Sequence, residues 1–433
     1  DERDAIKKDV NTVYESLGEP EDILSIRYQG VPVGEQIYDS VIKYKHATVE
    51  KIDQKVYNSI HDAFRNARAT QLLMKQKNIV AGVFTHDSCG RDGVMTRILI
   101  ANEKIVYNSY GGLGFLRRVT NYSDESARIP LMLRPNRKHV KLIEASAEGV
   151  SNVEKYFSEY TTGKTFYHEA ASSFNANVDT FTDKDVFNSN HELNTEKKNI
   201  FVFLHAMTDD PHIGGLKLFR DFYDWFEKTL EFAINDKNHN WVFKQHPFIS
   251  RYPDDANIEG IFKFLKNDNI IYINEHQEFN NKSLSHIADA VVTCGGTVGL
   301  EQACFGLQPL LAKQCHYSGF GFTCEPETQE QYFQYLQNTN LIKALSPEQI
   351  LTAKIVLYII YKIIRPSQFQ GFLDLENDSV KNILGFSGEK AMDSIIDKIE
   401  NRKEEFHSNC HEIINFIRSE PDLNEDFESF IKI

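Results

Sequence analysis

The stretch from Trp241 to Glu301 constrains the fold of this 433-residue chain more than any other. It closes with Val-Val-Thr-Cys-Gly-Gly-Thr-Val-Gly-Leu-Glu at 291–301, which predicts a buried strand, a glycine turn and a helix that Thr297 caps and Gly306 ends. Backbone N–H groups and about half a positive charge from the helix dipole meet at such a turn. Glycine allows an anion to approach the backbone closely. The stretch therefore predicts an anion-binding turn, suited to the phosphate of a nucleotide, in an α/β domain.

Strands and helices alternate regularly along the second half of the chain. Continuous apolar runs predict buried strands at 199–204, 241–245, 270–273, 290–293 and 309–312. Amphipathic runs predict helices at 216–234, 258–266, 284–288, 298–305, 327–337 and 346–364. This order predicts a doubly wound parallel sheet.

Polar residues follow these predicted strands. They are His205, Asp209, Lys244, His246 and Pro247. Because the carboxyl ends of parallel strands share one edge of a sheet, we expect these side chains to meet the glycine turn in one cleft. A histidine there can hydrogen-bond a phosphate or protonate a leaving group. Glu301, one helical turn past Thr297, is placed to hold ribose hydroxyls.

The first half of the chain carries a weaker α/β pattern. Helices are expected at 1–20 and 49–75, and a buried strand at 78–85, a helix at 93–102 and a strand at 104–109 predict a parallel βαβ unit. The run from His139 to Ile143 predicts a further strand. His86 ends the strand at 78–85 and is a candidate acid or base; the alternative is a loop histidine that bonds within its own turn.

The segment from Arg27 to Tyr44 and the polar segment at 161–196 organise the rest of this half. In the first, Arg27, Glu35, Tyr38 and Asp39 line a polar cleft or, alternatively, belong to a capped surface helix. The second is rich in Asn, Asp, Thr and Ser, which predicts an interdomain linker near 186–197.

Composition excludes several classes of function. A net charge of −14 without a basic block argues against nucleic-acid binding. The six cysteines include no CxxC pair, which gives no zinc site and fits a reducing, cytoplasmic compartment, with Cys294 and Cys304 as small buried residues. The most apolar run, 355–364, is too short to span a bilayer. The chain begins without Met or a signal peptide, so we expect that it can be an excised part of a longer protein.

Three segments together resemble the GT-B glycosyltransferases that build bacterial surface polysaccharides, in particular capsule and lipopolysaccharide enzymes of the Kdo-transferase type. The segments are Tyr-Gln-Gly-Val-Pro-Val-Gly-Glu-Gln-Ile-Tyr-Asp at 28–39, His-Ala-Met-Thr-Asp-Asp-Pro-His at 205–212, and Trp-Val-Phe-Lys-Gln-His-Pro at 241–247 together with 293–301. The resemblance implies two Rossmann-like domains, an acceptor-binding one at 1–190 and a nucleotide-sugar-binding one at 197–365, with a nucleotide cleft between them. A helical extension follows at 366–433.

The resemblance also implies roles for individual residues. Those implied to hold the donor are Lys244, His246, Pro247, Gly295, Gly296, Thr297 and Glu301. Those implied to hold the acceptor are Arg27, Tyr38 and Asp39. Asp209 is expected to face the anomeric carbon, as a nucleophile if configuration is retained, whereas its alternative role is a helix N-cap. If configuration is inverted, Glu35, Asp39 or His86 is expected to deprotonate the acceptor.

The expected reaction needs neither cofactor nor metal, because helix dipoles and basic side chains replace the metal in this fold class. The partners implied are a nucleotide-sugar donor, best matched by CMP-Kdo, and a glycan or glycolipid acceptor, with a peripheral membrane or assembly-complex partner possible. Alternatives are a UDP- or GDP-hexose donor, a CDP-glycerol glycerophosphotransferase, a sugar-nucleotide 2-epimerase and a non-catalytic capsule-assembly protein.

Overall fold

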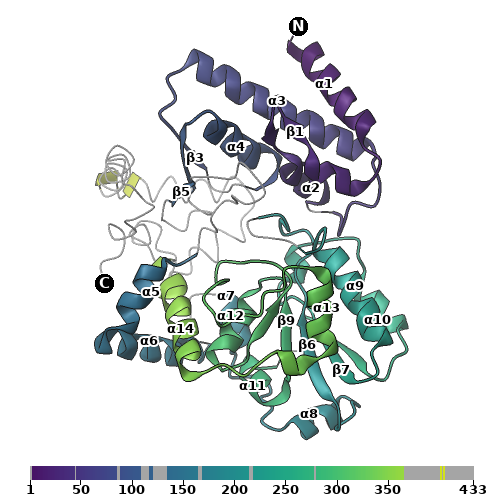
Figure 1. Cartoon of the computed structure of the whole chain (residues 1–433), viewed down its shortest axis with the longest axis vertical. Coiled ribbons are helices and arrows are strands. Elements are labelled where there is room, and N and C mark those ends of the chain that lie inside the picture. Colours follow the sequence, from purple (N-terminus) through teal and green to yellow (C-terminus); the bar gives the residue numbers. More distant parts are fainter. Residues whose placement is uncertain are drawn as a thin grey trace.

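The computed structural model describes residues 2–43, 45–84, 88–108, 117–119, 134–163, 168–213, 218–276, 279–364, 400–401 and 403–404. The helical extension predicted at 366–433 therefore lies outside the described residues, apart from four of them. The first elements of the chain occupy the upper part of Figure 1, and a five-stranded sheet with its helices occupies the lower part. The chain is a mixed α/β protein.

The first elements build a mainly helical layer. They are α1 (Glu2–Ser16), the 3-10 turn η1 (Pro20–Ser25), the hairpin β1 (Arg27–Tyr28) and β2 (Val31–Pro32), α2 (Gly34–Ile42) and α3 (Gln54–Gln76). Asp53 caps α3, since its side chain accepts hydrogen bonds from the backbone N–H groups of Lys55 and Val56. The apolar faces of α1, α2 and α3 share one core, which includes Val10, Ile37 and Phe64.

A small three-stranded sheet follows. Its strands are β3 (Ala81–Phe84), β4 (Ile105–Asn108) and β5 (Arg117–Val119). The π-turn η2 (Cys89–Gly93) and α4 (Val94–Ala101) join β3 to β4, and these two strands are parallel, which confirms the predicted βαβ unit. The expectation that β3 is buried was wrong, because it lies at the sheet edge and Val83 is 51% exposed.

The second half of the chain forms a five-stranded parallel sheet. Its strands are β6 (Lys198–Phe203), β7 (His239–Lys244), β8 (Ile270–Ile273), β9 (Ala290–Thr293) and β10 (Pro309–Leu311). They lie in the order β10-β9-β6-β7-β8, and every pairing is parallel. The predicted doubly wound sheet is therefore confirmed, and its strand order reverses between β6 and β9. Ligands of such sheets bind at this reversal.

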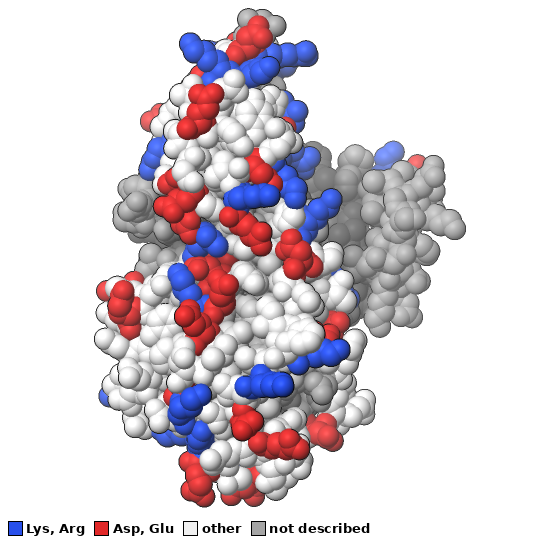
Figure 2. Space-filling model, turned by 90° about the vertical axis from the view of Figure 1, so that its right-hand side faces the viewer, with Lys and Arg blue, Asp and Glu red and all other residues white. Residues whose placement is uncertain are grey.

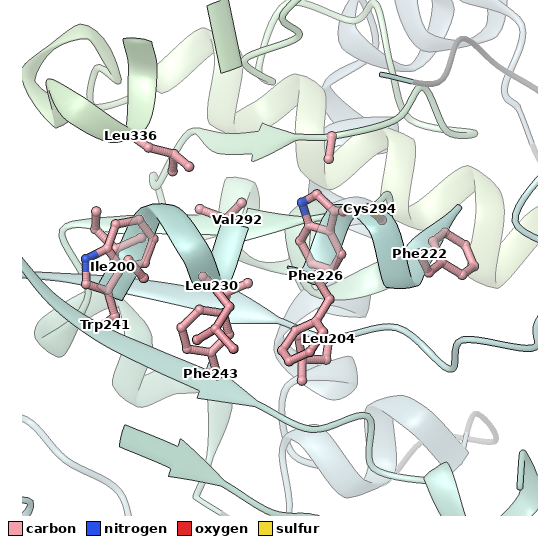
Figure 3. Close-up of a cluster of buried hydrophobic side chains, with 14 of the residues drawn as sticks. Ile200, Leu204, Phe222, Phe226, Leu230, Trp241, Phe243, Val292, Cys294 and Leu336 are labelled. Carbon is pink, nitrogen blue, oxygen red and sulfur yellow. The ribbon is translucent and has the colours of Figure 1, made fainter. Parts of the chain in front are cut away.

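Helices cover both faces of this sheet. One face packs against α9 (Phe222–Asn235), α10 (Ile258–Phe264) and α13 (Gln329–Gln337). Figure 3 shows that core, where side chains of β6, β7 and β9 meet Phe222, Phe226 and Leu230 of α9. The other face packs against α8 (Lys184–Asn190), α11 (Leu284–Ile287) and α12 (Thr297–Cys304). Successive side chains of β6 point to opposite faces of the sheet, so Ile200 lies in one core and Phe201 in the other. Both faces of the sheet are therefore covered by helices.

A third layer of helices lies on α12. It contains α5 (Arg137–Glu144), α6 (Ala147–Tyr160) and α14 (Pro347–Tyr358), which continues into the π-helical turn η6 (Ile359–Ile364). The strand expected from His139 to Ile143 was wrong, because these residues lie in α5. His139, Val140 and Ile143 are buried at helical spacing, and the two apolar ones contact the core shared with α14. Parts of the predicted acceptor domain therefore pack on the second sheet, and the domain boundaries stay predictions.

The remaining short elements connect these layers. They are α7 (His168–Ser173), η3 (Ile249–Arg251), η4 (Asn281–Ser283) and η5 (Thr339–Leu341). In the described part of the chain, no helix combines the length and the apolar character that crossing a bilayer requires. On the face drawn in Figure 2, acidic and basic side chains are interspersed.

The contact between α9 and α13 gives a test of this packing. The buried Tyr332 hydroxyl accepts a hydrogen bond from Trp225 Nε1 at 2.9 Å and lies 3.1 Å from Thr229 Oγ1. Tyr332→Phe leaves the indole N–H without this acceptor, so we expect a loss of about 1–3 kcal/mol in the free energy of unfolding, measured by urea denaturation. The half-buried Tyr223 of α9 serves as control, and Tyr223→Phe should cost less than about 0.5 kcal/mol. Equal losses of stability in the two variants would contradict a stabilising hydrogen bond between Trp225 and Tyr332.

Candidate functional site

A cavity of about 420 Å³ opens at the carboxyl edge of the five-stranded sheet. The segments that follow β6, β7, β9 and β10 line it, on both sides of the strand-order reversal. Of the sequence-predicted site residues, it brings together Asp209, Lys244, His246, Pro247, Gly295, Gly296, Thr297 and Glu301. The cavity therefore lies where the sheet topology places a ligand.

The glycine turn after β9 has the backbone that an anion site needs. Gly295 has φ +89°, a conformation that favours glycine, and the Gly296 N–H donates to Thr293 Oγ1 at 3.0 Å. Helix α12 starts at Thr297, with Gly296 as its N-cap. The expectation that Thr297 caps the helix was wrong, because its hydroxyl lies 3.1 Å from the hydroxyl of Tyr361. The predicted strand, glycine turn and helix are otherwise present, and the turn borders the cavity.

One side of the cavity carries Lys244 and Glu301. Glu301 is 1% exposed, and Tyr160 donates a 3.0 Å hydrogen bond to its Oε1. Asn281 lies between the two, with its amide 3.5 Å from Glu301 Oε2 and its carbonyl oxygen 3.4 Å from Lys244 Nζ. The Lys244 ammonium also lies 4.1 Å from the centroid of the Phe279 ring. Glu301 is thus held in place by neighbours from two other elements.

His246 and Asp209 project into the cavity from the ends of β7 and β6. The Phe248 backbone N–H donates to His246 Nδ1 at 3.2 Å, which assigns the ring proton of neutral His246 to Nε2. Burial, with a further contribution from Asp210, raises the pKa of Asp209. A carboxylate of raised pKa that lines a cavity is a candidate to exchange a proton with a ligand.

Asp210, which follows Asp209, connects the loop after β6 to the first layer of the protein. It adopts φ +46°, and its carboxylate pairs with Lys43 Nζ at 2.7 Å. The same carboxylate accepts hydrogen bonds from Ser88 Oγ at 3.2 Å and Cys89 Sγ at 2.8 Å. The loop that contains Asp209 is therefore held by contacts with residues at the end of α2 and the start of η2.

Two of the predicted acceptor residues lie at the junction between α2 and the residues that follow β6. The Tyr38 hydroxyl donates to Asp221, the N-cap of α9, at 2.5 Å. Asp39 accepts from His212 Nδ1 at 2.5 Å and from the His212 backbone N–H at 3.3 Å. Both side chains are buried, so Tyr38 and Asp39 join α2 to the 209–221 segment instead of lining the cavity.

Arg27 and Glu35 also lie apart from the cavity lining. Arg97 Nη2 pairs with Glu35 at 2.7 Å, and exposed Arg27 donates to the carbonyl of Gly30 within its own hairpin. His86 lies outside the described residues. Among the carboxylates predicted to be catalytic, Asp209 is the one that the cavity lining contains.

The sequence interpretation did not select Lys313, which lines the cavity two residues after β10. The rule that found Asp209 and Lys244, a polar residue at the end of a predicted strand, would also have found Lys313. Tyr160 and Asn281 could not be found in this way, because they come from a distant helix and a 3-10 turn.

In the described ranges, no group of three or more His, Cys, Asp or Glu side chains is arranged to hold a metal ion. Burial raises the pKa of the Cys294 and Cys304 thiols well above the usual value. These two cysteines are buried, as expected, and their thiols are poorly suited to act as nucleophiles.

No protein-family model and no curated protein matches the chain. Twelve solved chains are distantly similar, and three of them are described next. The KpsC β-Kdo 2,4 transferase of Thermosulfurimonas dismutans is 14% identical, with a TM-score of 0.34 over 64% of this chain and 78% of that chain. The KpsC β-Kdo 2,7 transferase of the same organism is 14% identical, with a TM-score of 0.35 over 66% and 80%. MnaA of S. aureus, solved with UDP, is 12% identical, with a TM-score of 0.26 over 72% and 80%. Likeness at this level assigns neither activity nor ligand.

Gly299 in the first turn of α12 provides a test of how the anion turn is built. The Tyr317 hydroxyl donates to the Gly296 carbonyl at 2.6 Å, and a methyl group on Gly299 would overlap that hydroxyl. We expect Gly299→Ala to cost about 1–3 kcal/mol in the free energy of unfolding, and the double variant with Tyr317→Phe to recover part of it. Gly18→Ala, at an exposed position with ordinary contacts, should change stability by at most about 1 kcal/mol. If the losses of Gly299→Ala and Tyr317→Phe simply add in the double variant, the methyl group does not clash with the Tyr317 hydroxyl.

The junction at Asp210 provides a second test. Lys43→Met leaves a carboxylate that is 9% exposed without its cation, so we expect a loss of about 3 kcal/mol in the free energy of unfolding. Asp62→Asn removes a surface pair with Arg65 whose side chains are 56% and 60% exposed, and should cost less than about 1 kcal/mol. Urea denaturation of both variants gives the comparison, and similar small losses would mean that the junction does not hold the loop.

Proposed function

We propose that the chain is a glycosyltransferase that takes a sugar from a nucleotide donor bound in the cavity of the five-stranded sheet. The observation that carries this proposal is the shared lining of that cavity by Asp209, His246, Lys244 and the Gly295–Gly296 turn. It combines an anion-binding turn, two basic side chains and one carboxylate of raised pKa. Groups of these kinds stabilise the charge that develops on a departing nucleotide phosphate.

In the proposed reaction, an acceptor hydroxyl attacks the anomeric carbon while the bond from that carbon to the phosphate oxygen breaks. The phosphate leaves with the electron pair, and the backbone N–H groups at Thr297 and Val298 together with Lys244 stabilise its charge. His246 donates a hydrogen bond from Nε2 to the departing phosphate. Asp209 takes the proton of the acceptor hydroxyl, and because the hydroxyl displaces the phosphate in a single step, the configuration of the anomeric carbon is inverted.

Glu301 is assigned the ribose hydroxyls, because it lies on the Lys244 side of the cavity with one oxygen bonded to Tyr160. We favour CMP-Kdo as the donor and a bacterial surface glycan as the acceptor, which the residue motifs suggest. The reaction is proposed to proceed without metal, since the helix terminus and the basic side chains supply the neutralising charge.

The direct test is nucleotide release in the presence and absence of a glycan acceptor, after thermal-shift screening of CMP, CDP, UDP and GDP. Acceptor-dependent release supports the proposal. Conversion of a sugar nucleotide to its 2-epimer without acceptor would identify an epimerase instead, and transfer from CDP-glycerol a glycerophosphotransferase. No stabilisation by any nucleotide would leave a non-catalytic assembly role.

The ionisation of Asp209 gives a pH prediction. Because the base must be ionised and its pKa is raised, kcat/KM should fall with decreasing pH at values above those of an ordinary aspartate, about pH 4. Asp209→Asn should lower kcat by about 10²–10⁴-fold.

The raised pKa of Asp209 also means that the folded state resists ionisation of this carboxyl, so the stability of the protein falls above the unfolded-state pKa. The same variant should therefore raise the melting temperature at pH 7.

The matched control is Asp254→Asn, because burial also raises the pKa of this carboxyl but it does not line the cavity. Its activity should stay within about two-fold of the unsubstituted protein. Retained activity in Asp209→Asn would rule out the assigned base.

A further inference from the structure

Two consecutive carboxylates of the loop after β6, Asp209 and Asp210, line the cavity. Burial raises the pKa of Asp209, and the charge of Asp210 raises it further. The positive charges of Lys43, His246 and Lys313 act in the opposite direction. Because two neighbouring carboxylates oppose each other's ionisation, the surroundings of each side chain decide which of them holds a proton.

The carboxylate of Asp210 accepts from donors at the end of α2 and the start of η2. Lys43, the C-cap of α2, pairs with Oδ2 at 2.7 Å, and Ser88 Oγ donates to the same oxygen at 3.2 Å. The thiol of Cys89 donates to Oδ1 at 2.8 Å. Burial raises the pKa of this thiol, and the charge of Asp210 raises it further, so Cys89 stays a neutral donor. Three donors to one carboxylate favour its ionised form.

Lys43 carries the positive charge among these donors. Burial lowers the pKa of its amine, but the hydrogen bond and the charge of Asp210 outweigh burial and raise that pKa above the usual value. The side chains of Lys43 and Asp210 are 20% and 9% exposed, so salt and water screen the pair weakly. The pair therefore places a fixed cation next to a carboxylate of the cavity.

The carboxylate of Asp209 has different surroundings. Its side chain is half-buried in the cavity lining, and no side chain or backbone N–H among the residues that the structure describes donates a hydrogen bond to it. Of two like charges in one site, the one with more donors stays ionised, and the other takes up a proton first as the pH falls. Asp209 is therefore the member of the pair that exchanges a proton.

We propose that Lys43 is a positioning residue of the cavity, whose ion pair keeps Asp210 ionised so that the exchangeable proton of the two carboxylates lies on Asp209. This inference rests on the proposed function, in which Asp209 accepts the proton of the acceptor hydroxyl. Lys43 itself does not line the cavity and acts through Asp210. The helical layer at the start of the chain thereby contributes a charge to the chemistry of the sheet edge.

The test removes the two charges of the ion pair separately and together. The measurement is the pH dependence of kcat/KM for CMP release from CMP-Kdo with a glycan acceptor, whose acid limb reports the pKa of the base. Lys43→Met removes a cation, so we expect the limb to move to higher pH by about one unit. Asp210→Asn removes an anion and should move the limb to lower pH. The double variant should lie between the two single variants.

Two further variants separate this electrostatic effect from a structural one. Lys43→Arg keeps the charge and should leave the limb within about 0.3 pH units of the unsubstituted chain. Lys184→Met removes the cation of a comparable pair with Asp289, at 2.6 Å and with 27% and 28% exposed side chains, which does not line the cavity. Its limb should not move. A loss of activity in Lys43→Met that is the same at every pH would make Lys43 a structural residue only.

A second measurement needs no substrate. Because the folded state resists ionisation of Asp209, Asp209→Asn should raise the melting temperature at pH 7. Without the cation of Lys43 the ionised form of Asp209 is less favourable still, so this rise should be larger in the Lys43→Met background than in the unsubstituted chain. Asp254→Asn is the control, because its effect on the melting temperature should be the same in both backgrounds.

Shifts of the same sign in Lys43→Met and Asp210→Asn overturn the inference, and so does a limb that stays in place in both. An equal rise of the melting temperature from Asp209→Asn in the two backgrounds also overturns it. In these cases CMP release by the unsubstituted chain still supports the proposed function. If the unsubstituted chain releases no CMP, the proposed function fails, and the melting temperatures decide whether Lys43 controls the ionisation of Asp209.

Discussion

The parallel pairing of β6 with both β7 and β9 is the constraint on which the rest of the structure depends. It makes the strand order reverse between β6 and β9, so the helices that follow them, α9 and α12, pack on opposite faces of the sheet. A gap at the carboxyl edge results from this divergence. The side chains after the strands meet there because of topology, and the chemistry of the cavity follows from which residues end each strand.

The loop after β6 connects that chemistry to the first layer of the protein. Asp209 and Asp210 both line the cavity, and the carboxylate of Asp210 is also bound by Lys43, Ser88 and Cys89. The left-handed backbone at Asp210 is a conformation that a non-glycine residue adopts at a cost, which the ion pair offsets. The first layer is therefore bonded to the residue that directly follows Asp209.

The sequence predicted the parallel sheet and the residues at its edge well, because both follow from local patterns: continuous apolar strands and the polar residue after each. It could not show contacts between residues that are far apart along the chain. Tyr38 and Asp39 bond to Asp221 and His212, which lie in another part of the sequence, and their acceptor role stays a prediction. The apolar run at 139–143 fits a short strand as well as a helix, and packing against α14 decided for the helix.

The most direct measurement of the central claim is a crystal structure of the full chain with CMP. We expect a phosphate oxygen within about 3 Å of the backbone N–H groups at Thr297 or Val298, with the ribose toward Glu301 and His246 facing the phosphate. A nucleotide bound elsewhere on the chain, or one whose phosphate faces away from the glycine turn, would contradict the account.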